Sequence, residues 1–245
     1  MTDAPIFDSD AWRLTDQERQ LTTQARELGE TRFADRASRY DREAKFPIEN
    51  YRDLHDAGLL GICIPSKYGG HGANLRTYAL TAAEVGRYCG STALTWNMHV
   101  CSCLWSGTMA DDLEMDRAVR ERHHETRRVH YRRILDDGAI YSQPFSEGGS
   151  AAAGTVAFST TAVRCDGGWV IRGKKIFASL SGSADYYGTL CTELQHAHDK
   201  PSRSNTLYLA VPAKAEGVRV VGDWDPLGMR ATVSRTLLFE EFFLP

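Results

Sequence analysis

The sequence lacks several features that would assign it to a specialised class of protein. No stretch approaches the roughly 20 apolar residues of a membrane span, and the start, MTDAPIFDSDAWRL, has no basic segment followed by an apolar run. We therefore expect a cytoplasmic protein that does not enter a membrane. The 29 Lys and Arg residues are outnumbered by 32 Asp and Glu, so the formal net charge of -3 gives no general reason to bind nucleic acid.

Cysteine pairs of the CxxC type are also missing. The six cysteines are Cys63, Cys89, Cys101, Cys103, Cys165 and Cys191. Their spacing matches neither a zinc knuckle nor a dithiol redox motif. Cys101 and Cys103 lie near His99, but one residue between two thiols is poor spacing for a pair of metal ligands. We therefore favour buried free thiols over a metal site.

The residues that are present describe an ordinary globular protein whose first part is helical. Its 245 residues are 42% hydrophobic and 25% charged, and the length suits two domains. Apolar residues recur with helical spacing from Leu14 to about position 135. Thr15 and Glu18 form the capping-box pattern, in which the two residues satisfy free amide hydrogens at a helix start. We predict an amphipathic helix that begins there.

Further helices are predicted in the same region. One begins near Pro47 and ends at Gly58, and the following LLGICIP is short and apolar enough to be buried. A third carries Tyr78 and Cys89 on its apolar face. Ser91 is expected to cap a fourth, STALTWNMHVCSCLWSG, which is apolar around most of its circumference and should be central.

The segment 111–133 stands apart because it holds seven arginines and three histidines with few apolar residues. We interpret it as a solvated helix or an extended surface insertion. Contact with nucleic acid is the alternative, and the acidic balance of the whole chain disfavours it.

Near Gly138 the apolar pattern changes from helical spacing to alternation, which predicts strands. The candidate strands are 139–146, 156–165, 169–178, 186–194, 206–211, 218–221 and 235–243. Asp166-Gly167-Gly168 should form a hairpin turn. The fold class is therefore α+β, with an N-terminal all-α domain (1–138) followed by a β-barrel or sandwich middle domain (139–245). A Rossmann site is not expected, because no strand, glycine-rich turn and helix follow one another.

Three segments of the β half carry groups that could bind a ligand. The first, 143–150 (QPFSEGGS), leaves a strand and enters a loop of small residues, where backbone amides and a hydroxyl could approach a phosphate or a flat heterocycle; a tight turn is the alternative. The second, 168–185, brings Phe177 and Ser179 to a strand end on one face, as a flat cofactor requires, or else forms a strand whose Phe packs inward. The third, 225–239, carries Arg230 and Ser234, which could hold an acidic ligand or simply start a strand.

Taken together, these three segments resemble the acyl-CoA dehydrogenase family, since they follow the order and approximate spacing of that family's motifs. The helical region before them fits as well, so the resemblance covers the chain from Leu14 onward. Ser146-Glu147 matches the first two residues of the family's Thr-Glu-Pro loop, although Gly148 replaces the proline. The resemblance implies an FAD-dependent oxidoreductase that dehydrogenates the α,β bond of an acyl-CoA thioester.

The resemblance also implies residue roles around the flavin. Gln143, Phe145 and Ser146 would line the edge of the flavin ring. Phe177 would stack beside the isoalloxazine. Ser179 would lie within hydrogen-bonding reach of the redox-active ring nitrogen and favour the reduced form.

On the substrate side, the resemblance implies that Ser150 lies near the pyrophosphate or the pantetheine of the thioester. Arg230 and Ser234 are weaker candidates for domain closure or for the polar part of the substrate. His99 and Trp96 could reach the acyl pocket, but a histidine packed in the core is the better interpretation of that position.

Members of the family continue past the position of Pro245 into a helical bundle that supplies the catalytic carboxylate. We therefore expect the N-terminal and middle domains of an enzyme that is truncated or completed by a separate chain, with weak flavin retention and little dehydrogenation. Glu147 does not replace the carboxylate, because its counterpart belongs to the flavin loop. The implied partners are an acyl-CoA, an electron-transfer partner or oxygen, and further copies of the chain in a homo-oligomer.

Two other interpretations remain open at this point. One keeps the fold and replaces dehydrogenation by oxygenation, as in related flavin monooxygenases. The other is a non-catalytic remnant that serves as an interaction module. Fold-level analogy does not decide among them.

Overall fold

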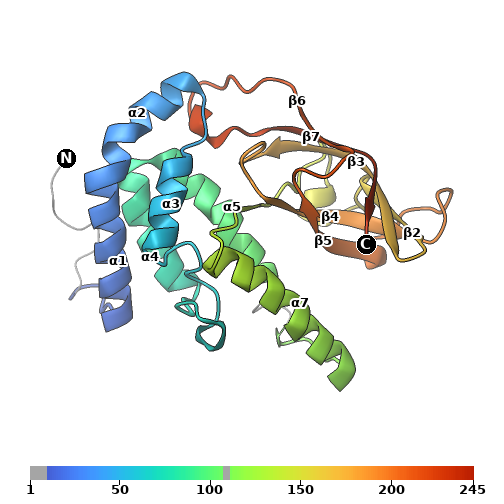
Figure 1. The fold of residues 1–245 in the computed structure, drawn as a ribbon, viewed down its shortest axis with the longest axis horizontal. Coiled ribbons are helices and arrows are strands. Elements are labelled where there is room, and N and C mark those ends of the chain that lie inside the picture. Colours follow the sequence, from blue (N-terminus) through green and yellow to red (C-terminus); the bar gives the residue numbers. More distant parts are fainter. Residues whose placement is uncertain (1–9, 107–110) are drawn as a thin grey trace. The chain divides into compact units, whose positions relative to one another are not determined.

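The computed structural model describes residues 10–106 and 111–245. The chain divides into two compact units, one formed by Met1–Ala139 with Leu227–Thr232, and the other by Ile140–Pro226 with Val233–Pro245. We call them the helical unit and the β unit (Figure 1). The first boundary lies one residue from the expected one, but the return of Leu227–Thr232 to the helical unit was not expected.

The helical unit contains the helices expected from the apolar spacing, with one irregularity. Its helices are α1 (Asp16–Leu28), α2 (Ala34–Glu43), α3 (Ile48–Asp56), α4 (Leu75–Tyr88), α5 (Gly90–Ser106) and α7 (Arg117–Leu135). A π-helical turn, Gly29–Phe33, joins α1 to α2. A Cβ at Gly29 would lie 2.2 Å from the ring of Tyr88, so a glycine there lets α1 approach α4 closely.

Local sequence signals explain where these helices begin. The capping box is present, since the Thr15 side chain accepts from the backbone N–H of Glu18 and the Glu18 carboxylate accepts from the backbone N–H of Thr15. The predicted cap at Ser91 is wrong, because α5 begins at Gly90 and Ser91 is a buried residue within its first turn. As expected, α5 is central, and Trp96 and Val100 are almost completely buried.

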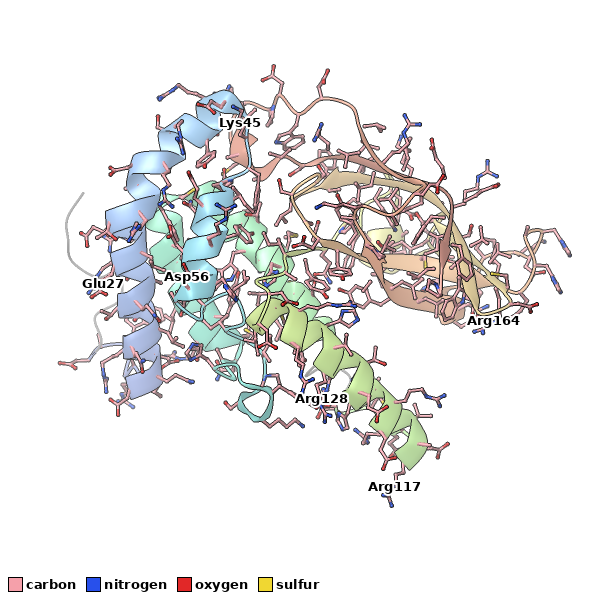
Figure 2. All side chains as sticks on the ribbon, in the orientation of Figure 1. Glu27, Lys45, Asp56, Arg117, Arg128 and Arg164 are labelled. Carbon is pink, nitrogen blue, oxygen red and sulfur yellow. The ribbon has the colours of Figure 1, made fainter. Side chains whose placement is uncertain are left out.

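The basic segment forms a helix, α7, whose arginines are mostly solvated. Figure 2 shows Arg117 at its start and Arg128 further along. Arg127 departs from the expected surface position. It is only 1% exposed and forms a salt bridge with Asp111, with 2.7 Å between Nη1 and Oδ1. None of the described helices is long and apolar enough to cross a membrane.

The β unit is a single mixed sheet that curls on itself (Figure 1). Its strands are β1 (Tyr141–Ser142), β2 (Thr161–Cys165), β3 (Gly168–Ala178), β4 (Tyr186–Leu194), β5 (Thr206–Pro212), β6 (Val218–Val221) and β7 (Arg235–Leu244). The main order is β1-β4-β2-β3-β7-β6, and β5 pairs with β4. The strands therefore form a curled sheet of the barrel type and not two stacked sheets.

Register places the ligand-binding candidates at strand ends. β1 and β2 run parallel to β4, while β3 is antiparallel to β2 and β7. Cys165 pairs with Gly168 across the predicted hairpin turn, where Gly167 has φ +80°.

β1 is much shorter than expected because 143–150 leaves the sheet. Cys165 is exposed at this turn, so the expectation that all cysteines are buried is wrong there.

Replacing Thr15 by Ala should destabilise the helical unit by about 1 kcal/mol, because an amide hydrogen at the start of α1 loses its acceptor. Thr23→Ala, in the middle of the same helix, is the matched control and should cost nothing, since Ala is the better helix former. Urea unfolding followed by far-ultraviolet circular dichroism measures both variants. Equal destabilisation by the two would refute the role of the cap.

Candidate functional site

The second and third predicted segments meet at the end of β3 in the β unit, and Ser142, at the end of β1 directly before the first segment, contacts the same place. The Ser142 hydroxyl donates to the Ser179 carbonyl at 2.5 Å, and the hydroxyl oxygens of Ser179 and Ser234 lie 2.8 Å apart. The Ser181 hydroxyl donates to the Val233 carbonyl at 2.6 Å. Segments that are about 90 residues apart in the chain therefore converge on one pair of serine hydroxyls.

The backbone around this serine pair is strained. Phe177, Leu180 and Val233 have φ values of 52°, 64° and 46°, a region that side chains other than glycine rarely adopt. Val233 is the strongest outlier, because a β-branched side chain suits this conformation least. Ser181 holds the segment in place, since its backbone N–H donates to the Val233 carbonyl. Such strain concentrates at sites that bind or switch.

Phe177 is not packed inward, which was the alternative interpretation of its strand. Its side chain is 65% exposed, and its ring meets the Trp224 ring edge-on with 6.1 Å between centroids. A large aromatic ring that is left in solvent at a strained strand end offers a flat surface to a ligand.

Gln143 supplies an unsatisfied polar group to the same unit. It is 8% exposed, and its Nε2 has no hydrogen-bond partner among residues 10–106 and 111–245. Buried amide groups nearly always have partners in native proteins. An orphaned buried donor in this loop is therefore the feature expected where a ligand supplies the missing acceptor.

The structure also locates the other candidate residues of the 143–150 loop. The Phe145 ring packs against the cluster of Ala151, Phe158 and Leu190. The Ser146 carbonyl accepts from the backbone N–H of Ile176 at 2.8 Å, which ties the loop to β3. Ser150 is exposed before the 3-10 turn Ala151–Ala153.

A buried ion pair holds this loop against the sheet. The Lys175 ammonium lies 2.7 Å from Glu147 Oε1, and the two side chains are 0% and 4% exposed. Lys175 also donates to the Leu190 carbonyl at 2.6 Å and lies 4.4 Å from the centroid of the Phe158 ring. Its charge is thus neutralised inside the sheet and its hydrogens are used.

Glu147 is the centre of this arrangement. Its carboxylate accepts from the backbone N–H and hydroxyl of Ser159 and from the backbone N–H of Thr160. Burial alone would raise the pKa of Glu147, but the hydrogen bonds from Lys175, Thr160 and Ser159 and the charge of Lys175 outweigh it and lower the pKa to about 2. The carboxylate is therefore ionised and fully engaged at neutral pH.

Arg230, a sequence candidate for substrate contact, has a structural partner in the helical unit. Its backbone N–H donates to Asp41 Oδ1 at 2.9 Å and its Nε donates to the Asp41 carbonyl at 2.9 Å. Its guanidinium also forms a salt bridge with the same carboxylate at 3.3 Å. Arg230 thus fixes Leu227–Thr232 to the end of α2.

His99 lies in the core of the helical unit, as the packed-core interpretation expected. It is completely buried, and its Nε2 lies 3.1 Å from the Leu60 carbonyl. Burial lowers the pKa of His99 to about 4. Within the described ranges, no group of three or more His, Cys, Asp or Glu side chains could hold a metal ion.

Comparison with known proteins agrees with these motifs. Residues 15–110 match the acyl-CoA dehydrogenase N-terminal domain, and residues 145–242 match the acyl-CoA dehydrogenase middle domain. The chain belongs to the acyl-CoA dehydrogenase family. The resemblance inferred from the three segments is confirmed.

Individual relatives are distant and include more than one activity. A probable acyl-CoA dehydrogenase of Bacillus subtilis is 25% identical over 240 residues, which cover 96% of this chain and 58% of that protein. The L-evernosamine nitrososynthase of a Micromonospora strain is 26% identical over 218 residues, which cover 85% of this chain and 46% of that protein. FMN-bound TdsC from Paenibacillus has the same fold, with a TM-score of 0.75 and 23% identity. The match covers 92% of this chain and 52% of the TdsC chain. The chain thus spans about half the length of these proteins.

Sequence reasoning did not anticipate the interactions that support these candidate residues. It treated Lys175 only as one position of a motif, and it placed Glu147 in the loop without a partner. The signal available was a charged residue at an alternating, inward-facing strand position, since a buried lysine needs a counter-charge. Val233 and Ser142 gave no local signal.

Glu147→Gln should destabilise the β unit by about 3–5 kcal/mol, because it leaves the Lys175 ammonium buried without its counter-charge. The matched control is Glu240→Gln, which removes the partner of Arg219 from an exposed pair and should cost less than about 1 kcal/mol. Hydrogen exchange of the β3 and β4 amides measures both variants.

The two variants should also differ in how their stability changes as the pH falls. The pKa of Glu147 is lower in the fold than its ordinary value of 4.5, so its contribution is present above that pH and is lost as the pH falls toward about 2. This part of the acid sensitivity should disappear in Glu147→Gln and persist in Glu240→Gln. Equal losses of stability in the two variants would contradict the role of the buried pair.

Proposed function

We propose that this chain is the flavin-binding part of an FAD-dependent oxidoreductase that dehydrogenates the α,β bond of an acyl-CoA thioester. The observation that carries the proposal is the hydroxyl pair of Ser179 and Ser234, next to the exposed ring of Phe177 on a strained backbone. The buried, unpartnered amide of Gln143 supports it, since the residues present fit a flat, hydrogen-bonding cofactor.

The residues that carry this proposal have distinct roles. Phe177 stacks on the ring system, and the Ser179 hydroxyl hydrogen-bonds the ring and stabilises its electron-rich form, with Ser234 orienting that hydroxyl. Gln143 and the backbone of Ser146 bind the polar ring edge. FAD, when bound, supplies the acceptor for the hydride that leaves the substrate's β carbon.

The proton on the substrate's α carbon needs a base, and two carboxylates of this chain are unsuited to that task. Glu147 makes hydrogen bonds with three residues and has a pKa of about 2, so it is a poor acceptor for a carbon-bound proton. Asp41 is engaged by Arg230. These two residues therefore hold the fold and leave base catalysis to another group.

A flavin-dependent monooxygenase of the same fold is the second candidate. The nitrososynthase relative matches this chain as well as the dehydrogenase relatives do in percentage identity, and the Ser179 site suits either chemistry. In that case reduced flavin and oxygen replace the acyl-CoA oxidation. The dehydrogenase is our first choice because both matching family domains carry its name.

The chain should bind FAD, and Phe177→Ala should weaken binding by about tenfold through the loss of the stacked ring. Phe243→Ala is the matched control, because Phe243 is a similarly exposed phenylalanine on β7 at 47% exposure. Quenching of flavin fluorescence at fixed salt measures the affinity. If the protein is colourless and does not bind added FAD, it is a remnant without a cofactor, and the proposal is refuted.

The reaction itself is tested in the protein expressed from its entire reading frame. Anaerobic addition of saturated acyl-CoAs should bleach the flavin absorbance and yield the α,β-enoyl thioester. Failure to bleach, combined with NADH consumption by an added flavin reductase and incorporation of oxygen into an amine or sulfur substrate, would establish the monooxygenase instead.

A further inference from the structure

A second candidate site lies in the helical unit, away from every motif of the flavin site in the sequence. It is a pocket of about 250 Å³ between the loop after α3 and the helix α7. Its lining residues are Lys67, Tyr68, Gly69, Arg128, Tyr131 and Arg132. Three of these six residues are cationic and none is acidic, a composition that neither flavin binding nor the packing of the core requires.

The aromatic walls of this pocket are fixed from behind. Arg127 Nε donates to the Tyr68 hydroxyl at 3.2 Å, and the Tyr131 hydroxyl donates to the Cys103 carbonyl at 3.3 Å. The two tyrosine rings are 5.3 Å apart between centroids. Because both hydroxyls bond to other groups of the protein, the rings themselves are held as preformed pocket walls.

The cations at the rim are not neutralised by the protein. Lys67, Arg128 and Arg132 are exposed and form no ion pair with any acidic side chain in the part of the chain that the structure describes. Other arginines of the same helix differ, since Arg117 pairs with Glu121 and Arg127 pairs with Asp111. Three like charges around one concavity repel one another, and an anion in the pocket would relieve this repulsion.

His124, which neighbours the pocket, is affected by the same positive charges. Burial lowers the pKa of His124, and the positive charges of Arg127 and Lys67 lower it further. Arg128 and Arg132 are four residues apart on α7 and therefore project from the same face of the helix. Their guanidinium groups can both donate hydrogen bonds to the oxygens of one tetrahedral anion such as a phosphate, which arginine recognises well.

We propose that this pocket binds a small phosphate ester, with the phosphate held by Lys67, Arg128 and Arg132 and a flat organic part lying against Tyr68. The pocket is smaller than the roughly 300–1,000 Å³ of typical drug-sized sites, so the ligand is a small molecule. A free phosphate ion would use the cations alone and would make no contact with the ring of Tyr68.

Phenyl phosphate and inorganic phosphate are the probes, titrated by calorimetry and by chemical-shift changes of backbone amides in the intact chain. Phenyl phosphate should bind more tightly than inorganic phosphate by about tenfold, because only the ester contacts the ring wall. Gly69 and Arg132 amides should shift, while amides of β3 and β7 should not. Equal affinities would identify a site for free phosphate and overturn the assignment to an ester.

The charge contribution is tested on one helix. Arg128→Gln combined with Arg132→Gln should weaken phenyl phosphate binding by at least about tenfold, since it removes charge-assisted hydrogen bonds. The control is Arg117→Gln, at the far end of α7 from Arg128 (Figure 2), whose side chain is 92% exposed. It should change the affinity by less than about twofold, because exposed charges far from the ligand are screened.

Two outcomes would overturn the proposal. One is the absence of binding to the unmodified chain at millimolar phenyl phosphate. The other is an equal loss in Arg117→Gln and in the double variant, especially if a single-stranded oligonucleotide behaves in the same way, because α7 would then be a diffuse basic surface. Circular dichroism of the double variant checks that α7 remains folded, and a Tyr68→Leu variant that retains inorganic phosphate binding but loses the preference for the ester supports the proposed wall.

Discussion

The ion pair between Glu147 and Lys175 is the interaction on which the organisation of the β unit rests. A buried lysine is costly unless its charge is matched, and here one carboxylate provides the match while accepting further hydrogen bonds from Ser159 and Thr160. The loop 143–150 has little regular structure of its own, yet it has a defined place because its glutamate is fixed at the sheet. The residues on either side, Gln143 and Ser150, inherit their positions from that attachment.

The serine pair at the end of β3 depends on the same principle of mutual constraint. Positive φ values at Leu180 and Val233 are unfavourable in isolation, so they persist only because hydrogen bonds from both segments hold them. The arrangement turns the hydroxyls of Ser179 and Ser234 toward each other. Phe177 is exposed in the part of β3 where the register with β7 shifts, between Lys175 and Ala178.

Much of this fold could be predicted from the sequence, and the physical reasons are visible. Strands such as β4 and β6 are rich in residues that favour strands, and the structure gives them the bounds that the sequence predicted. The capping box at Thr15 is an equally local signal. The short β1, the π-helical turn after Gly29 and the strain at Val233 could not be predicted, because each arises from contacts with residues far away in the chain. The partner of Lys175 could not be predicted either, because no local pattern identifies which acidic residue will face a buried lysine.

The excursion of Leu227–Thr232 has a consequence for how the chain can be divided. The polypeptide leaves the β unit after Pro226, contributes one short turn to the helical unit through Arg230 and Asp41, and returns at Val233. Neither unit is therefore a continuous stretch of sequence. A gene fragment that stops near residue 139 would encode every described α-helix of the first unit and still omit the peptide that contacts the end of α2. Expression of that unit on its own therefore calls for a graft or a circular rearrangement of the chain.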